Sequence, residues 1–158
     1  MLREYLENMA AAWTAHGRTP PLETFVLRNG VERQGNTRPK GVRRSTPKMC
    51  FRNAALLALN KGDAYYEGYA ITARLPLAIH HAWVMRGDVL IDNTWEDPAA
   101  AFYMGVPFTT DVLRRTILKT RHWGLLDTGL GLNIDLMCEL DGGFAEAIGY
   151  HPTKRGTP

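Results

Sequence analysis

The sequence predicts a protein of mixed helices and antiparallel strands. A mostly apolar run between Pro47 and Asn60 has the length and composition of a buried helix. Two strand-like stretches, residues 80–86 and 89–95, are separated by Gly87-Asp88, which is typical of a two-residue hairpin turn. We therefore expect a central buried helix accompanied by an antiparallel hairpin.

The length and composition fit one soluble domain. The chain has 158 residues, of which 45% are hydrophobic and 22% are charged, values that are usual for a packed globular protein. We expect a single domain over residues 1–158, with a tail at 151–158. No apolar run reaches the ~20 residues that a membrane helix needs, and the first residues lack the apolar core of a secretory signal. These features predict no membrane partner and a cytoplasmic location.

The first part of the chain predicts one helix followed by irregular structure. Apolar residues at helical spacing indicate an amphipathic helix over residues 2–13, namely Leu2, Tyr5, Leu6, Met9 and Trp13. Pro20-Pro21 is expected to stop this helix, and a short extended stretch over residues 25–27 leads into a turn at Asn29-Gly30. Residues 33–47 are polar and basic, and we expect them to form a mobile loop.

The buried helix is expected to begin close to Cys50. Ser45 or Thr46 is suited to cap it, and Pro47 is suited to its first turn. Cys50 then lies within or close to that turn, ahead of the apolar residues 54–59. The pattern therefore predicts a thiol at the start of a buried helix.

Beyond this helix the chain predicts further strands and shorter helices. A strand is expected over residues 64–71, before the hairpin, and an extended piece over 106–108. A helix is expected over residues 111–119, after a threonine cap. Glycines interrupt the last part of the chain, where a short helix over 134–140 is the interpretation that the residues favour.

The basic residues concentrate in one stretch. The chain carries 19 basic and 16 acidic residues, a formal net charge of +3, and many of the basic ones lie within residues 33–48. Aromatic residues are not interleaved with these charges, so the stretch fits a solvated loop better than a nucleic-acid surface. Nucleic-acid binding here stays a weaker alternative, which a steep dependence of affinity on salt would reveal.

The two cysteines, Cys50 and Cys138, are too few for a disulfide scaffold. No CxxC pair indicates a structural zinc site. In a cytoplasmic protein both side chains are expected to be reduced thiols, with Cys138 in a structural role.

The predicted hairpin fixes the faces on which His81 and Asp92 lie. With a two-residue turn, Arg86 faces Val89, and side chains alternate between the two faces of each strand. His81 and Asp92 then share one face as diagonal neighbours, close enough for their side chains to meet. A three-residue turn would bring His80 to that face instead.

A thiol, an imidazole and a carboxylate in this arrangement favour nucleophilic chemistry. The start of a helix stabilises an anion, so Cys50 is placed to react as a thiolate. A histidine supplies the base, and a carboxylate fixes its tautomer. Taken singly, each residue has an ordinary explanation: Cys50 as a core residue, His81 as a half-buried histidine, and Asp92 as a turn former.

Four motifs follow one another in a recognisable order. Cys50 opens a buried helix, residues 65–70 read Tyr-Tyr-Glu-Gly-Tyr-Ala, residues 81–83 read His-Ala-Trp, and residues 91–94 read Ile-Asp-Asn-Thr. This order resembles the transglutaminase-like and related papain-like cysteine enzymes, over roughly residues 47–95. The chain departs from the family's pattern in having Asn rather than Pro after the aspartate, and it shows no Ca²⁺ loop.

The resemblance implies a fold, a reaction and a set of residues. It implies an α+β, transglutaminase-like (papain-like) fold in which the nucleophile-bearing helix packs on an antiparallel β-sheet, as in a compact prokaryotic or phage-type member. The reaction is acyl transfer or amide hydrolysis on a protein or peptide (peptidase, deamidase or transglutaminase type), without a cofactor, in the host cytoplasm if the chain is phage-encoded. Its catalytic residues are Cys50, His81 and Asp92. The oxyanion donor is the backbone N–H of Cys50, and four side chains are candidates for a further donor or a substrate contact: Gln34, Asn36, Asn53 and Trp83.

Two alternatives stay open from the sequence. The chain is alternatively a non-catalytic phage or bacterial module that uses the same fold to bind a host partner. The same three residues, Cys50, His81 and Asp92, are also a mixed ligand set that suits a single zinc ion.

Overall fold

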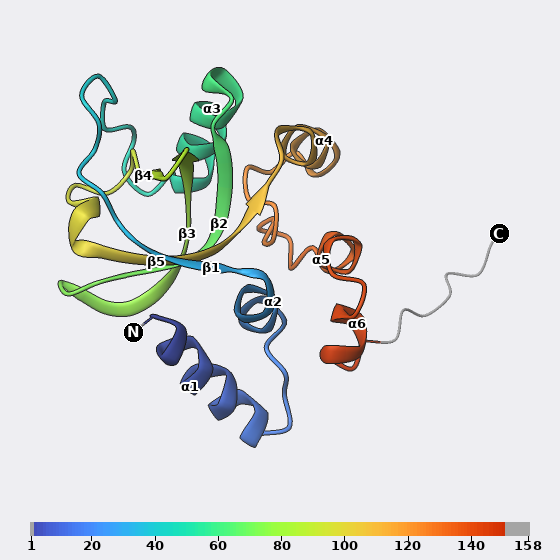
Figure 1. The fold of residues 1–158 in the computed structure, drawn as a ribbon. Coiled ribbons are helices and arrows are strands. Elements are labelled where there is room, and N and C mark those ends of the chain that lie inside the picture. Colours follow the sequence, from blue (N-terminus) through green and yellow to red (C-terminus); the bar gives the residue numbers. More distant parts are fainter. Residues whose placement is uncertain (1, 151–158) are drawn as a thin grey trace.

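The computed structural model describes residues 2–150, so the tail predicted at 151–158 lies outside the described residues. The protein is an α+β fold built on a curled antiparallel sheet of five strands in the order β1-β5-β2-β3-β4 (Figure 1). The strands are β1 (Val31–Gln34), β2 (Ala64–Thr72), β3 (Leu75–Arg86), β4 (Val89–Ile91) and β5 (Ala101–Phe108).

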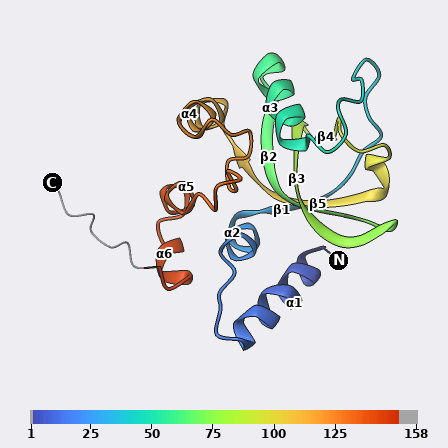
Figure 2. The same ribbon diagram turned by 180° about the vertical axis from the view of Figure 1, so that it is seen from behind.

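Helices lie around this sheet (Figure 2). They are α1 (Leu2–Ala15), α2 (Pro21–Asn29), α3 (Cys50–Lys61), α4 (Thr110–Thr120), α5 (Ile134–Leu140) and α6 (Phe144–Ala147), with a short 3-10 turn at Pro98–Ala100. No helix among residues 2–150 combines the length and the apolar character that crossing a membrane requires.

Both faces of the sheet are buried, and the alternation of side chains divides the residues of each central strand between two apolar clusters. On β3, Ala82 and Val84 contribute to the large core that the helices cover, and Trp83 and Met85 contribute to a second cluster on the other face. The second cluster consists of Ala70, Trp83, Met85, Leu90, Ala101 and Tyr103. β3 therefore carries one face toward α3 and the other toward a separate aromatic core.

The α3 helix packs closely on the sheet through small residues. Ala54, Ala55 and Ala58 are at most 1% exposed and lie in the large core. Alanine side chains let the helix approach the strands, and burying them against the sheet supplies hydrophobic stabilisation. The helix begins at Cys50 and ends at Lys61, and its C-cap, Gly62, adopts the left-handed conformation that glycine tolerates. This packing fixes the position of the thiol relative to β3.

Two expectations about helix starts were wrong. Residues 25–27 are not extended but lie within α2, where Pro21 occupies the first turn and Leu22, Phe25 and Val26 are buried at helical spacing. Neither Ser45 nor Thr46 caps α3; the N-cap is Met49, which has no side-chain capping bond.

Other elements agree with the sequence to different degrees. The strand at 64–72 and the helices at 110–120 and 134–140 lie where they were predicted. β5 extends to residue 101, well before the predicted start at 106, and β4 ends at Ile91, short of the predicted residue 95.

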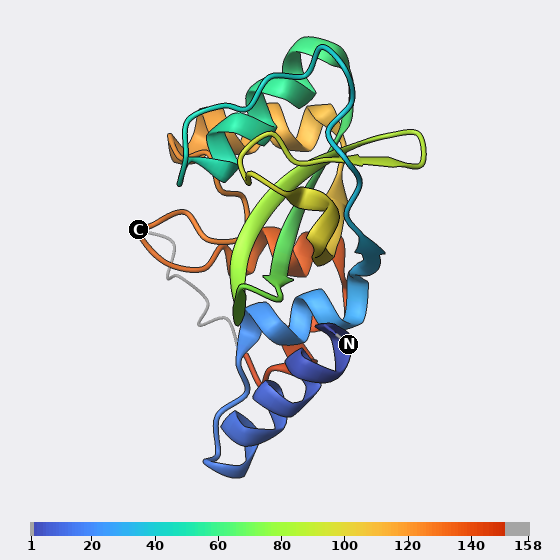
Figure 3. The same cartoon turned by 90° about the vertical axis from the view of Figure 1, so that its left-hand side faces the viewer.

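The basic stretch is attached to the body of the protein at several points. Arg33 and Gln34 pair with Tyr103 and Phe102 as part of β1, so the first residues of the predicted loop are strand. The rest of the stretch runs beside α3 (Figure 3), and the Ser45 N–H donates to the Asn93 carbonyl at 2.7 Å.

Candidate active site

Cys50 is the first residue of α3 and is 8% exposed. The first hydrogen bond of the helix runs from the Asn53 N–H to the Met49 carbonyl at 2.8 Å. The N–H groups of Cys50, Phe51 and Arg52 therefore have no acceptor within the helix, and no capping side chain satisfies them. They leave a positive end of the helix dipole beside the thiol.

His81 lies beside both of the residues that the sequence predicts as its partners, Cys50 and Asp92. Its Nε2 lies 2.8 Å from Oδ2 of Asp92, with both side chains at most 1% exposed. The Cys50 thiol lies close enough to His81 to raise the pKa of the imidazole. The three side chains thus form a continuous line from sulfur to imidazole to carboxylate.

The register of the hairpin explains the contact between His81 and Asp92. Arg86 pairs with Val89 and Val84 with Ile91, as a two-residue turn requires. β4 then ends, so the part of β3 before Val84 has no strand partner on its outer edge. The chain turns at Asp92 and brings its carboxylate back to the His81 ring.

Asp92 is held by donors on both of its oxygens. Oδ1 accepts the N–H groups of Thr94 at 2.7 Å and Trp95 at 3.2 Å, and Oδ2 accepts the Tyr103 hydroxyl at 3.0 Å in addition to facing His81. A buried carboxylate is costly unless its lone pairs are satisfied, and these bonds satisfy them. The Asp-Asn-Thr sequence therefore forms a turn around its own carboxylate.

The pKa values of His81 and Asp92 reflect their burial and their hydrogen bonds. Burial lowers the pKa of His81, but the hydrogen bonds and charges of Asp92 and Cys50 outweigh burial and raise the pKa from 6.5 to about 9. Burial raises the pKa of Asp92, but the hydrogen bond and charge of His81 and the Thr94 and Trp95 N–H groups bring it below its usual 3.8. An imidazolium beside a carboxylate is thus favoured at neutral pH.

Arg38 and Arg44 of the basic stretch hold the turn that carries Asp92. Arg38 donates to the carbonyls of Asp92 (3.3 Å) and Trp95 (2.5 Å), and Arg44 donates to the carbonyl of Thr94 (3.1 Å). These guanidinium groups satisfy carbonyls that lie outside any strand. Part of the basic stretch is therefore a support for the site, a role that charge alone did not reveal.

Aromatic rings enclose the imidazole. The Trp95 ring lies 4.5 Å from the His81 ring, and the Tyr103 ring lies 6.1 Å from it. Sequence reasoning did not assign Tyr103 to the site. Its strand, β5, is separated from β3 by β2 in the sheet order, and its only signal was a tyrosine within an apolar stretch.

The four further candidates lie at separate places. Gln34 pairs with Phe102 at the end of β1, and the Asn36 Oδ1 accepts the Leu90 N–H at 2.8 Å. The side-chain oxygen of Asn36 therefore supports the backbone of β4.

The contacts of Asn53 and Trp83 hold parts of the fold together. Asn53 donates to the Thr46 carbonyl (2.7 Å) and the Thr94 hydroxyl (3.0 Å), which joins α3 to the Asp92 turn. Trp83 is 1% exposed, and a Cβ on Gly105 would lie 2.5 Å from its ring. Its burial argues against contact with a substrate.

His80 points to the opposite face of β3, as the alternation of side chains requires. Its ring lies 4.8 Å from the ring of Phe51, and its Nε2 lies 3.1 Å from Oε1 of Glu67 without the angle of a hydrogen bond. His81, not His80, is therefore the histidine that meets Asp92.

Among residues 2–150, no group of three or more His, Cys, Asp or Glu side chains is placed to hold a metal ion. The geometry therefore gives no support to the zinc alternative.

Comparison with known proteins adds no family to these observations. No protein-family model matches the chain, and searches of curated proteins and of solved structures found no match either.

Proposed function

We propose that this protein is a cysteine-dependent enzyme of the transglutaminase-like and papain-like kind, which cleaves or transfers an amide-linked acyl group. The observation that carries the proposal is the buried His81–Asp92 hydrogen bond with the Cys50 thiol close enough to raise the pKa of His81. The order of motifs in the sequence and a nucleophile-bearing helix packed on an antiparallel sheet support the same family. Its substrate is a protein or peptide, and its place of action is the cytoplasm.

The first step forms a thioester. The Cys50 thiolate attacks the carbonyl carbon of the amide, a C–S bond forms, and the C–N bond breaks. The His81 imidazolium gives its proton to the departing amine, which leaves neutral. Asp92 holds the imidazole in the orientation that this transfer needs and stabilises its charged form.

The second step restores the site. Water or an amine gives a proton to His81 as it attacks the thioester carbon, and the C–S bond breaks. The products are a carboxylic acid or a new amide, together with the original thiolate and imidazolium. Hydrolysis and transamidation thus share the same residues, and they differ in which acceptor reaches the thioester.

The start of α3 is suited to the negative oxygen that forms in both steps. The N–H groups of Cys50, Phe51 and Arg52 have no acceptor in the helix, and free N–H groups at a helix start stabilise an anion. We assign the Cys50 N–H as the first donor. Asn53 is an unsuitable second donor because both of its amide N–H bonds have partners.

Selective alkylation tests the nucleophile, with Cys138 as an internal control. Burial raises the pKa of the Cys138 thiol, and Asp135 and Asp141 raise it further, so this thiol reacts slowly at neutral pH. With iodoacetamide at pH 6.5, we expect Cys50 to be labelled at least ~10-fold faster than Cys138. The His81→Ala variant should lose this advantage. Equal, slow labelling of both cysteines would instead support the non-catalytic binding module.

A second measurement tests acyl transfer itself. An activated ester such as p-nitrophenyl acetate should acetylate Cys50, and intact-protein mass spectrometry should detect the acetyl group before it is hydrolysed. The Cys50→Ser variant is the matched control, because it keeps the fold and removes the sulfur. A protein that alkylates rapidly at Cys50 but never carries the acetyl group would contradict the proposed reaction.

A further inference from the structure

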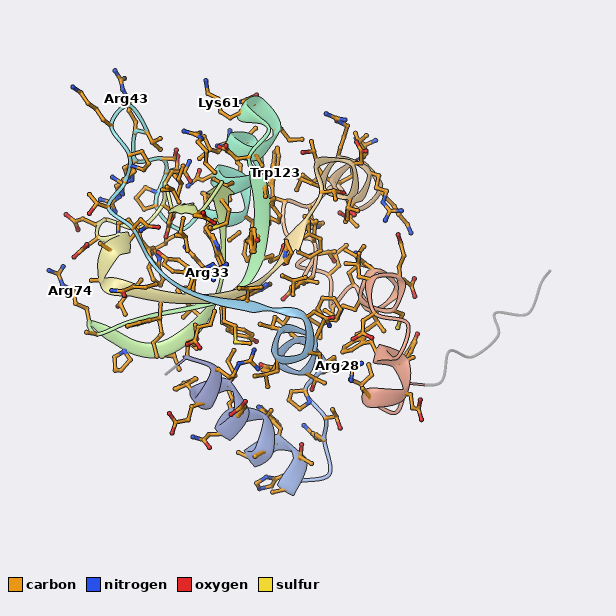
Figure 4. All side chains as sticks on the ribbon, viewed as in Figure 1. Arg28, Arg33, Arg43, Lys61, Arg74 and Trp123 are labelled. Atoms are coloured by element: carbon orange, nitrogen blue, oxygen red, sulfur yellow. The ribbon has the colours of Figure 1, made fainter. Side chains whose placement is uncertain are left out.

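A pocket of about 290 Å³ opens beside the start of α3. Its lining includes Met49 and Phe51, the two sequence neighbours of Cys50, and Trp123 from the segment after α4 (Figure 4). Phe51 and Trp123 give it aromatic walls, and Met49 is 42% exposed. A pocket of this size and lining fits one large apolar side chain.

The far wall of the pocket is fixed by a buried carboxylate. Glu67 is fully buried and accepts the N–H groups of Leu125 (2.7 Å) and Leu126 (2.9 Å) and the hydroxyl of Tyr65 (2.9 Å). These bonds pin the segment that supplies Gly124, Asp127, Thr128 and Gly129 to the pocket. A loop anchored in this way presents a preformed surface rather than one that must be ordered on binding.

Two cations stand at the rim of the pocket. Lys48 and Arg52 both line it and both are exposed. Asp127 also lines it, and its Oδ1 accepts the Gly129 N–H at 2.8 Å. Two cations against this one carboxylate leave a rim that favours a negative group on the ligand.

Lys48 adds an independent observation. Its φ is +66°, a conformation that costs a residue other than glycine free energy. Such strain persists where the surrounding structure or the function requires it. Lys48 lies two residues before the nucleophile, in a conformation that suits glycine. It keeps a positive charge at the rim despite the cost of that conformation.

We propose that this pocket selects the acyl donor: it binds a large apolar or aromatic side chain of a peptide, and Lys48 and Arg52 favour an acidic residue next to that side chain. The inference rests on the proposed function, because it assigns substrate recognition to the site of Cys50. It assigns specificity to residues outside the Cys50, His81 and Asp92 line.

Peptide vinyl sulfones test this selection because the Cys50 thiolate adds to their vinyl carbon and a proton completes the adduct. Eight probes suffice: four carry Phe or Ala beside the electrophile and Glu or Lys before it, and four carry the same pairs in the reverse order. Each rate of modification is divided by the iodoacetamide rate of the same protein, which removes differences in thiol reactivity. We expect Phe to exceed Ala by about tenfold or more, and Glu to exceed Lys by about threefold or more.

Charge reversal at the rim is the matched variant. The double substitution Lys48→Glu and Arg52→Glu should make the Lys probe the faster one and leave the preference for Phe unchanged. Lys61→Glu reverses one charge at the other end of α3 (Figure 4) and should change neither preference.

The outcomes separate this inference from the proposed function. Rapid iodoacetamide labelling of Cys50 with equal rates for all probes would overturn the pocket assignment and leave the thiol chemistry standing. Slow iodoacetamide labelling would overturn the proposed function. The pocket is then judged by binding of the Glu-Phe peptide to Cys50→Ser protein, followed by calorimetry, and absence of that binding would overturn it as well.

Discussion

Tyr103 and Asp92 are joined by a buried hydrogen bond, in which the Tyr103 hydroxyl donates to Asp92 Oδ2 at 3.0 Å. The same oxygen lies 2.8 Å from His81 Nε2. Burial raises the pKa of Tyr103 well above 10, and the charge of Asp92 raises it further, so the phenol stays protonated and remains a donor. The position of the carboxylate therefore depends on a residue from a strand that is not a neighbour of β3.

Removing this hydroxyl tests the dependence. In Tyr103→Phe, Asp92 keeps its two backbone donors but loses one donor on the oxygen that faces His81. Hydrogen bonds to charged groups contribute roughly 1.5–3 kcal/mol, and we expect the free energy of unfolding to fall by about this amount. Urea denaturation at pH 7 measures it. Tyr66→Phe is the control, since this tyrosine packs against the same aromatic cluster, and a loss as large as that of Tyr103→Phe would contradict the assignment.

The pKa of His81 gives a prediction for NMR titration. We expect the ring to titrate near pH 9 in the wild type, well above the usual 6.5. In Asp92→Asn the carboxylate charge is gone while burial persists, so the pKa of His81 should fall toward or below its usual value. Chemical shifts of ¹⁵N-labelled histidine report both values. A wild-type ring that titrates near 6.5 would contradict the hydrogen bond between His81 and Asp92.

The same shift makes folding stability depend on pH. The pKa of His81 is higher in the folded protein than in the unfolded chain, so protonation stabilises the fold. This contribution is fully present below pH 6.5 and is lost as pH rises through about 9. Since one pH unit of difference corresponds to about 1.36 kcal/mol, the loss is on the order of 3 kcal/mol. Urea denaturation between pH 6 and 10 measures this loss. The His81→Gln variant has no imidazole to titrate and should not show it.

The contact between His81 and Asp92 was predictable because local rules determine it. A two-residue turn at Gly87-Asp88 sets the register, and the alternation of side chains then sets which face each residue occupies. The length of β4 was not predictable in the same way, because Asp92 satisfies its own turn and leaves the ladder at Ile91.

The hydrogen bonds that hold the Asp92 turn could not be predicted from the sequence, because they join residues that are far apart in the chain. Arg38 reaches Asp92 across 54 positions of the chain, and no spacing rule links them. β5 was recognised only at its end because it lies inside the sheet with both faces buried, so residues 101–105 show no alternation of polar and apolar side chains. The α2 helix was predicted as extended because Phe25-Val26-Leu27 favours strands locally, and packing against the sheet overrides that preference.

Glu67 supports a prediction about the loop that forms the pocket wall. In Glu67→Gln one oxygen that accepts backbone N–H groups becomes an amide nitrogen, which cannot accept them. We expect the unfolding free energy to fall by roughly 2–3 kcal/mol and the amides of Leu125 and Leu126 to exchange faster with deuterium. Glu23→Gln is the control, because Glu23 accepts the Tyr69 hydroxyl at 2.7 Å in a half-buried place. Unchanged exchange at Leu125 and Leu126 would contradict the role of Glu67.

Lys48 allows the effects of backbone strain and of charge to be separated. Lys48→Gly and Lys48→Ala both remove the cation, but only glycine adopts the φ of +66° without strain. We therefore expect Lys48→Gly to be more stable than Lys48→Ala by about 1 kcal/mol in urea denaturation. Both variants should lose the same part of the preference for Glu over Lys in the vinyl sulfone probes. Arg121→Gly relieves a similar φ of +63° at the end of α4 and should leave that preference intact. If Lys48→Ala alone lost the preference, the conformation of the backbone rather than the charge would be its cause.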